Sequence, residues 1–250
     1  MSDTSFSLRN IKIACSNCSL GALCLPYGLN GEDVDRLDEI IKRNHPYQRN
    51  EFLFSPEQSF KNLHVVKTGA VKTYVPDDEG QERVIGFHLP GEILGLDAIE
   101  SNKHSCFAKA LETTAVCEMP FERLEDLSKD LPSLQHQMLR LMSREVSNES
   151  QMIALLNHST AEERLASFIV SLAERFQRRG FSSTDFFLPM SRQDIGSYLG
   201  LALETVSRLF TRFQELNLLK VERKHIEILD MEALKGVISH KTECQSVKAS

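Results

Sequence analysis

Hydrophobic and polar residues recur with different periods along the chain, and each period predicts a local structure. Near the N-terminus the period is that of one face of a helix, at Val34, Leu37, Ile40 and Ile41. Asn30, followed by acidic residues, predicts the start of this helix. The pair His45-Pro46 predicts its end, because the residue before a proline avoids helical angles.

From about residue 46 to residue 119 the apolar residues form short segments separated by turn signals. The turns fall at Gly69, at residues 77–80 and at Pro90-Gly91. The segments span residues 52–54, 63–66, 71–75, 84–89, 93–96, 108–111 and 115–119. Short, evenly spaced strands with turns between them predict a compact antiparallel β-roll.

Helical spacing returns after Pro120, first in a short helix over residues 121–128 and then in a long one. Pro132 opens the long helix, which we expect to run to about Asn157, a length of roughly 39 Å. One apolar row on it suits packing against the roll: Leu134, Met138, Leu141, Met152 and Leu155. A second row has the heptad spacing of a seam between two helices and predicts a homodimer. This dimer seam comprises Leu139, Met142, Val146, Glu149, Ile153 and Leu156.

Glu149 is a charged residue in this otherwise apolar seam. In one interpretation the seam is shallow there and the carboxylate reaches solvent. In the other, two Glu149 side chains approach across a two-fold axis and weaken the dimer by repulsion. A dimer weakened in this way can be switched by a second signal, so both interpretations stay open at this stage.

The C-terminal part has the pattern of a winged helix-turn-helix. Ser159 and Thr160, each followed three residues later by an acid, predict a helix start, and Gly180 predicts its end. Residues 190–213 then read as a short helix capped by Ser191, a turn at Gly200 and a second helix to about residue 216. Residues 220–221 and 226–229 predict a small β wing. The tail from about residue 240 has no periodicity, and we expect it to be mobile.

The second helix of this motif presents three polar residues on its first turns. Glu204, Ser207 and Arg208 stand at positions i, i+3 and i+4, at the end that enters the major groove in a helix-turn-helix. Arginine recognises guanine, a carboxylate accepts from cytosine, and serine is permissive. Arg212, one turn further, suits a DNA phosphate. The alternative is a solvated helix face with a Glu204–Arg208 pair, but the motif around these residues favours DNA contact.

Composition describes an ordinary globular protein, with 41% hydrophobic and 26% charged residues and a net charge of −6. All of the acidic excess lies before residue 158, and the remainder of the chain is only slightly basic. DNA binding would therefore depend on a local patch and not on bulk charge. No apolar run approaches the length of a membrane span, and the first ten residues lack the apolar core of a secretion signal. We therefore expect a cytoplasmic protein, where clustered cysteines usually bind metal or do redox chemistry.

Three of the six cysteines, Cys15, Cys18 and Cys24, fall within ten residues. Thiolates this close can converge on one metal centre, with a fourth ligand from elsewhere. A structural zinc site remains open, although its usual paired motifs are missing. Enzyme motifs such as a Gly-rich phosphate loop or a nucleophile elbow are also missing, so we do not expect an enzyme.

This order of parts resembles the CRP/FNR superfamily of bacterial transcription regulators, and within it the fumarate and nitrate reduction regulators. The resemblance covers nearly the whole chain, and it rests on the cysteine spacing, residues 86–98, residues 110–121 and residues 204–208. It implies an α+β fold with a β-roll of the cyclic-nucleotide-binding type, a long dimerisation helix and a C-terminal winged helix-turn-helix. The segments expected are a cluster loop (1–30), a roll (31–131), a dimerisation helix (132–157), a DNA-binding domain (158–240) and a tail (241–250).

The resemblance also implies a [4Fe–4S] cluster, with Cys117 at the position of its fourth ligand. Dioxygen would convert the cluster to [2Fe–2S], and the dimer would then revert to monomers that leave DNA. The expected partners are double-stranded DNA with TTGAT-type half-sites, a second copy of the chain and RNA polymerase, with no membrane. Leu23 would limit oxygen access, and Ser19 would tune the conversion rate. We expect Cys106 to be a buried apolar thiol, and Cys244 to have no role.

A response to cyclic AMP is a further candidate function, because some members of the superfamily bind this nucleotide. Their roll uses a Gly-Glu segment and an Arg-Ser pair that grips the cyclic phosphate. Gly91-Glu92 matches the first element, but residues 104–106 occupy the place of the pair without an arginine. An anion without its bidentate partner would bind poorly. We therefore expect the roll to be a scaffold that no longer binds a nucleotide. Relatives that bind haem are a poorer comparison, because haem binding would not require three N-terminal cysteines.

Overall fold

The computed structural model describes residues 14–239, so the predicted tail and Cys244 lie outside the described residues. Two short 3-10 turns, η2 (Cys15–Asn17) and η3 (Gly21–Leu23), form the cysteine loop and are followed by α1 (Gly31–Ile40). The Asn30 side chain caps α1 by accepting from the Asp33 N–H, as predicted. The helix ends earlier than His45-Pro46 predicts, because the chain from Lys42 onward pairs with the roll instead.

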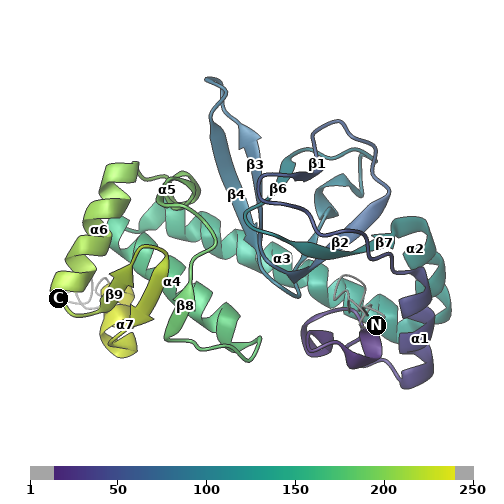
Figure 1. The fold of residues 1–250 in the computed structure, drawn as a ribbon. Helices are drawn as coiled ribbons and strands as arrows, with labels where there is room; N and C mark the ends of the chain where they lie inside the picture. Colours follow the sequence, from purple (N-terminus) through teal and green to yellow (C-terminus); the bar gives the residue numbers. More distant parts are fainter. Residues whose placement is uncertain (1–13, 240–250) are drawn as a thin grey trace, which may run out of the picture.

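The roll consists of two antiparallel sheets (Figure 1). Its strands are β1 (Phe52–Phe54), β2 (Asn62–Thr68), β3 (Val71–Pro76), β4 (Glu82–His88), β5 (Ile93–Leu94), β6 (Phe107–Ala110) and β7 (Ala115–Pro120), and a 3-10 turn, η4 (Leu96–Ala98), follows β5. One sheet has the order β1-β6-β3-β4 and the other β5-β2-β7. Each of the seven segments that the apolar pattern singled out overlaps one of these strands.

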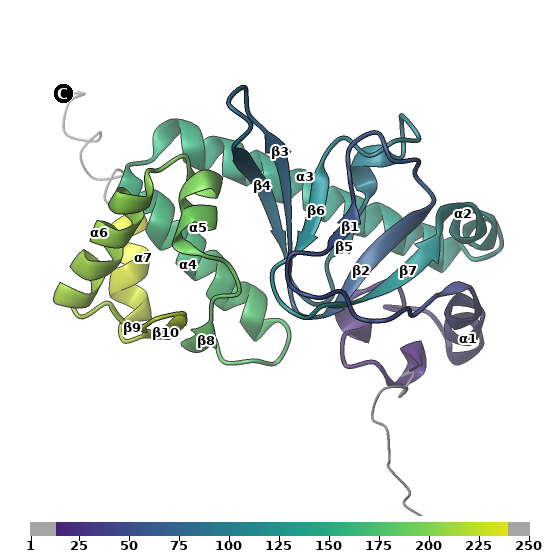
Figure 2. The ribbon, with the colours of Figure 1, turned by 45° about the horizontal axis from the view of Figure 1, so that its top comes forward.

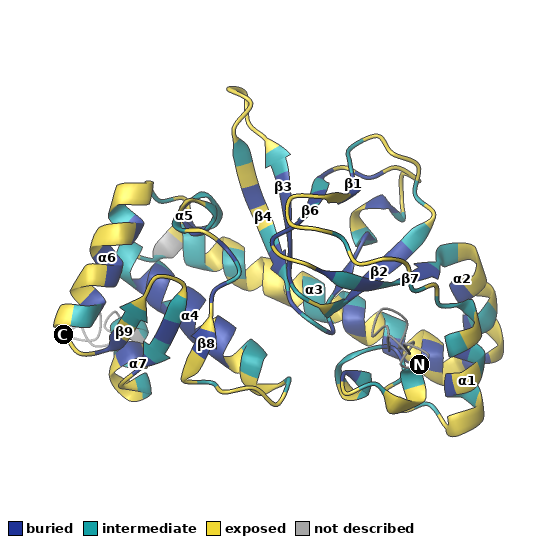
Figure 3. Ribbon diagram, in the orientation of Figure 1, coloured by how far each residue is buried: buried dark blue, intermediate teal, exposed yellow. Residues whose placement is uncertain are grey.

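Two helices follow the roll, α2 (Phe121–Asp130) and the long α3 (Pro132–His158), which passes behind the roll toward the C-terminal half (Figures 1 and 2). The row of α3 expected to pack on the roll begins with the buried residues Leu134 and Leu141. On the predicted dimer seam, Leu139, Val146 and Ile153 are 59%, 63% and 61% exposed. The middle of α3 is accordingly a largely uncovered stretch of helix (Figure 3).

The C-terminal half is a helical domain with a small sheet. Its elements are α4 (Ala161–Gln177), β8 (Asp185–Phe187), α5 (Arg192–Leu199), α6 (Leu203–Glu215), β9 (Leu219–Glu222), β10 (His225–Ile228) and α7 (Met231–Ser239). Thr160 and Glu163 form the predicted capping box of α4. The wing has a third strand, in the order β8-β10-β9. The sequence pattern had not predicted β8 or α7.

One apolar core continues from the roll into this half of the chain. Phe87 of β4 packs against Phe168 of α4 and Tyr198 of α5, with ring centroids 5.9 and 5.0 Å apart. The same cluster includes Val84 and Leu89 of the roll. The structure therefore confirms the predicted α+β architecture and shows the two halves docked on each other. None of the helices within residues 14–239 is both long and apolar enough to cross a membrane.

Candidate metal centre and DNA-reading helix

Four cysteines lie around one small pocket between the N-terminal loop and the roll. Cys15 and Cys18 are at η2, Cys24 directly follows η3, and Cys117 lies on β7. Cys117 is opposite Val65 of β2 in the sheet, and both residues line the pocket. The fold thus brings together the four cysteines that were expected to be ligands, although Cys117 lies 93 positions after Cys24, the nearest of the other three in the sequence.

The other walls of this cysteine pocket are mainly apolar: Leu20, Gly21, Leu25, Pro26, Ile41, Val65, Val66 and Met119, with Lys67 adding a charge. The pocket encloses about 30 Å³, room for roughly one or two water molecules. Within residues 14–239, no three His, Cys, Asp or Glu side chains form a group that could hold a metal ion. The donor set fits an iron–sulfur cluster, which is held by four cysteine thiolates. In this conformation the pocket is too small for one, so the loop would have to move outward.

Asp38 and Arg43 hold the first cysteine in place. The Cys15 backbone N–H donates to Asp38 Oδ1 at 2.7 Å, and Arg43 Nη2 donates to Cys15 Sγ at 3.5 Å. Burial and the Asp38 carboxylate raise the pKa of Cys15. Burial, with the thiols of Cys117 and Cys18 nearby, raises the pKa of Cys24 to about 12. Both thiols are therefore protonated at neutral pH in this conformation, and binding of a metal would release protons.

The cysteine loop is also fastened to the long helix. Gln137 Nε2 of α3 donates to the Cys24 carbonyl oxygen at 3.0 Å, and Arg144 Nη2 donates to the Leu23 carbonyl oxygen at 3.4 Å. Between them, the Arg140 guanidinium lies 5.1 Å from the centre of the Tyr27 ring. Three successive turns of α3 thus contact residues 23–27. Sequence reasoning had not identified these contacts, because they depend on how the loop docks on the helix.

Ser19 and Leu23, the two residues expected to tune the cluster, have different surroundings in the structure. Ser19 is exposed, and Leu23 is half-buried with its Cβ facing Gly91, where an added Cβ would come within 3.1 Å. Leu20, which the sequence did not single out, is 8% exposed and lines the cysteine pocket. Cys106 is a buried thiol in the core of the roll, as expected.

The helix-turn-helix consists of α5 and α6, held together by a close turn. Ser191 and Asp194 form the predicted capping box of α5, and Gly200 ends it in the left-handed region, with φ at 63°. A Cβ added at Gly196 would lie 2.6 Å from the Leu201 carbonyl oxygen, so the turn needs a glycine there. The apolar spacing of the motif predicts that Leu203 helps to hold the two helices together. In the structure Leu203 is instead 43% exposed, because it lies at the first position of α6, off the buried face.

The predicted DNA-reading residues are exposed on the outer face of α6. Glu204, Ser207 and Arg208 lie on its first turns, and Arg208 donates to Thr205 Oγ1 at 3.4 Å. Arg212 forms an ion pair with Glu162 of α4 at 2.9 Å, with 58% of its side chain exposed. A DNA phosphate would compete with Glu162 for this arginine. Figure 1 shows α6 at the end of the molecule farthest from the cysteine loop.

Glu92, which matches the Gly-Glu segment of cyclic-nucleotide binders, is engaged by the DNA-binding half. Arg175 Nε donates to Glu92 Oε1 at 2.9 Å, and Arg179 Nη2 donates to the same oxygen at 2.6 Å. Burial raises the pKa of Glu92, but the two arginines outweigh it and bring the pKa to about 2. The neighbouring Ser105 donates to Asp97 through its N–H and its hydroxyl. These groups thus have structural partners within the protein.

A β-roll joined by a long helix to a winged helix-turn-helix defines a class of transcription regulators that bind DNA. Two family models match the chain: the Crp-like helix-turn-helix domain over residues 163–237, and the cyclic nucleotide-binding domain over residues 44–130. The solved structure of FixK2 from Bradyrhizobium japonicum superposes with a TM-score of 0.73 at 27% identity, covering 79% of this chain and 97% of FixK2.

Curated relatives narrow the class further. The transcriptional activator protein Anr of Pseudomonas protegens is 52% identical over 216 residues, which cover 86% of this chain and 88% of Anr. The fumarate and nitrate reduction regulatory protein of Escherichia coli is 47% identical over 228 residues, covering 91% of each chain. The chain belongs to the CRP/FNR family of transcription regulators, and within it to the FNR type.

Proposed function

We propose that this regulator responds to oxygen through a [4Fe–4S] cluster held by Cys15, Cys18, Cys24 and Cys117. With the cluster in place, two copies of the chain form a homodimer that binds palindromic TTGAT-type sites. Oxygen would convert the cluster to [2Fe–2S], and the dimer would then separate and leave DNA. The observation that carries the proposal is the convergence of these four thiols, from the N-terminal loop and from β7, on a single pocket.

The names of the relatives support the same proposed function. A fumarate and nitrate reduction regulatory protein is similar to this chain over nearly its full length. When bound, the cluster supplies an oxygen-sensitive group that links the loop to the roll. Cys15, Cys18 and Cys24 would bring the loop to it, and Cys117 would anchor it to β7. Arg43 and Lys67 place positive charge near these thiolates.

The path to the dimer seam follows from the contacts between the loop and α3. The pocket is too small for a cluster, so the loop would have to move to hold one. Gln137 and Arg144 would carry this movement to α3, because they hold the carbonyl oxygens of residues 24 and 23. The seam residues Leu139, Met142 and Val146 lie on the same turns of α3. A shift of a few kcal/mol in the dimer equilibrium is enough to switch DNA occupancy.

The output is the pair of α6 helices that a dimer presents. Glu204, Ser207 and Arg208 would contact base edges, and Arg212 a phosphate, in two half-sites about 34–36 Å apart. Contact with RNA polymerase through surface loops completes the proposal, as for other regulators that activate transcription. A cyclic-nucleotide response is the weaker alternative, because Glu92 is held by Arg175 and Arg179.

Metal analysis after anaerobic purification tests the proposal. We expect iron and labile sulfide in a brown protein with visible absorption, and loss of both in Cys117→Ala. Cys106→Ala is the matched control, because that thiol lies in the core of the roll and away from the pocket. A colourless, zinc-loaded protein would contradict the proposed function, and so would a Cys117→Ala variant that retains the wild-type iron and sulfide.

A further inference from the structure

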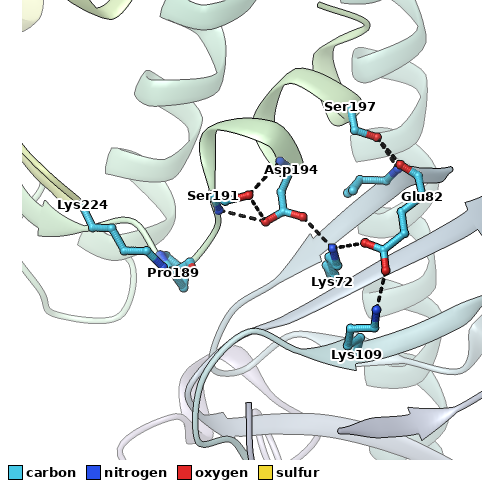
Figure 4. Close-up of polar contacts among 9 residues, drawn as sticks. Lys72, Glu82, Lys109, Pro189, Ser191, Asp194, Ser197 and Lys224 are labelled. Carbon is cyan, nitrogen blue, oxygen red and sulfur yellow. Dashed lines mark hydrogen bonds and ion pairs between the residues drawn. The ribbon is translucent and has the colours of Figure 1, made fainter. Parts of the chain in front are cut away.

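A buried lysine of the roll forms an ion pair with the first helix of the helix-turn-helix (Figure 4). Lys72 of β3 has 8% of its side chain exposed and lies between Glu82 of β4 and Asp194 of α5. Its Nζ donates to Asp194 Oδ1 at 2.6 Å and also to Glu82 Oε2. Lysine is almost never fully buried unless it is paired. This cation therefore joins the sensory roll to the DNA-binding half.

Asp194 performs two tasks at the start of α5. Its Oδ2 accepts from the Ser191 N–H at 2.9 Å and from the Ser191 hydroxyl at 2.6 Å, and its Oδ1 faces Lys72. Burial raises the pKa of Asp194, but Lys72 and Ser191 outweigh it and lower the pKa. The carboxylate is thus charged at neutral pH, and Lys72 holds the same turn that the capping box defines.

A second contact lies one helical turn further along α5. The Ser197 hydroxyl donates to the Glu82 carbonyl oxygen at 2.7 Å and accepts from the Val84 N–H at 2.9 Å. Strand β4 is at the edge of its sheet, where backbone groups lack a neighbouring strand. Ser197 satisfies two of these groups, so α5 lies against the open edge of the roll at a fixed position.

The position of α5 determines that of α6. The two helices share a buried apolar contact through Ile195, Val206 and Phe210. The turn between them passes so close to Gly196 of α5 that no side chain would fit there. Because packed helices of this kind move as a unit, a constraint on α5 is also a constraint on the DNA-reading residues of α6.

We infer that Lys72 is a positioning residue for DNA reading: through Asp194 it fixes the angle at which α6 is presented relative to the dimer seam of α3. In a dimer that binds two half-sites, this angle determines which half-site spacing both α6 helices can engage. The inference rests on DNA binding by the helix-turn-helix in a dimer, and it does not require a metal cluster.

The experiment compares Lys72→Met with Lys109→Met in the full chain. Lys109 of β6 donates to the same Glu82 carboxylate, but its other contacts, over the Phe52 and Tyr74 rings, lie within the roll. Both variants remove one cation from the same cluster, and only the first removes the link to α5. Asp194→Asn is a second variant, because the amide oxygen of asparagine can still accept from the Ser191 N–H but the side chain carries no charge for Lys72.

Two measurements are made on each protein. Amide hydrogen exchange follows α5 in the protein without DNA, and binding assays use TTGAT-type palindromes with the preferred spacing or with one base pair inserted between the half-sites. We expect Lys72→Met and Asp194→Asn to speed exchange in α5, and to lower the preference for the correct spacing, by about fivefold or more. Lys109→Met should match the wild type in both.

A general loss of folding would weaken binding to both DNA spacings alike and leave their ratio unchanged. The inference is overturned if the spacing ratio of Lys72→Met equals that of the wild type, even where exchange in α5 is faster. It is also overturned if Lys72→Met and Lys109→Met change exchange in α5 equally. If no protein binds either DNA, the exchange measurement alone decides whether Lys72 holds α5, and unchanged exchange rejects the link.

Discussion

Glu149 is an exposed carboxylate in the middle of the predicted dimer seam of α3. Its apolar neighbours in the seam, Val146 and Ile153, are themselves more than half exposed. Two such carboxylates facing each other across a two-fold axis would oppose association, and the apolar residues around them would favour it.

Glu149→Ala should therefore form dimers without a metal cluster, because removal of the repulsion leaves the apolar contacts. Sedimentation of the protein in air measures this directly. Gln151→Ala is the matched control, since Gln151 is exposed on the same helix but off the seam. A Glu149→Ala protein that remains monomeric would show that the carboxylate only meets solvent.

Gln137 is a buried polar residue of α3 whose side chain holds the Cys24 carbonyl oxygen. Gln137→Leu keeps the size of the side chain and removes this hydrogen bond, at a cost of about 1 kcal/mol in the free energy of unfolding. We expect the variant to retain iron but to dimerise about fivefold less tightly when loaded. The measurement is anaerobic sedimentation together with iron analysis.

Gln135→Leu serves as the control for this variant, because Gln135 is exposed on the same turn of α3. Dimerisation of Gln137→Leu at the wild-type level would mean that the cysteine loop communicates with α3 by another route.

Cysteine spacing made the meeting of Cys15, Cys18 and Cys24 at one pocket predictable, since three thiols in ten residues are unusual in a chain with six. Gln137, Arg144 and Leu20 could not be predicted in the same way. A glutamine in a helix has the same pattern whether it faces solvent or a carbonyl oxygen. Only the docking of the loop on α3 determines whether such a glutamine meets solvent or a carbonyl oxygen.

Glu92 joins the turn before β5 to helix α4 through Arg175, and to the turn after α4 through Arg179. The Glu92 carboxylate in turn acts electrostatically on His88 of β4 and Glu145 of α3, where its charge favours a higher pKa. The pKa of Glu92 falls from 4.5 to about 2 on folding. A lowered folded pKa means that Glu92 contributes stability above pH 4.5, and that this contribution is lost as the pH falls toward 2.

Glu92→Gln should destabilise the protein at pH 7 by about 3 kcal/mol, because two arginines lose their partner. The difference from the wild type should shrink between pH 4.5 and pH 2, where wild-type Glu92 becomes protonated. Denaturant unfolding over this pH range measures it. Glu57→Gln, which removes an exposed ion pair with Lys103, should follow the wild-type curve. A difference that is independent of pH would contradict the assignment.

Among the elements, those with a strong local signal were predicted well. The capping boxes at Thr160 and Ser191 and the left-handed Gly200 lie where the sequence placed them. Strand β8 has only three residues and forms because β10 pairs with it, so no local pattern indicates it. Helix α7 does carry helical spacing, at Met231, Leu234, Val237 and Ile238, and could have been found. The end of α1 was wrong because pairing of Lys42 with Glu118 outweighs the local signal.

For the molecule as a whole, the order of roll, long helix and winged helix-turn-helix was predictable from the changes in hydrophobic period. The docking of the two halves was not. It depends on contacts such as Phe87 with Tyr198 and Lys72 with Asp194, which join residues more than a hundred positions apart. Charged residues in these positions look like ordinary surface residues until the halves meet.

The central claim is that oxygen controls the oligomeric state and DNA binding through the four cysteines. It is tested most directly by sedimentation and DNA binding of the wild type and Cys117→Ala, each prepared without air and then exposed to it. We predict that the wild type is a DNA-binding dimer without air and a non-binding monomer after exposure, and that Cys117→Ala is a monomer in both conditions. If air changes neither the oligomeric state nor the DNA binding of the wild type, the account is wrong.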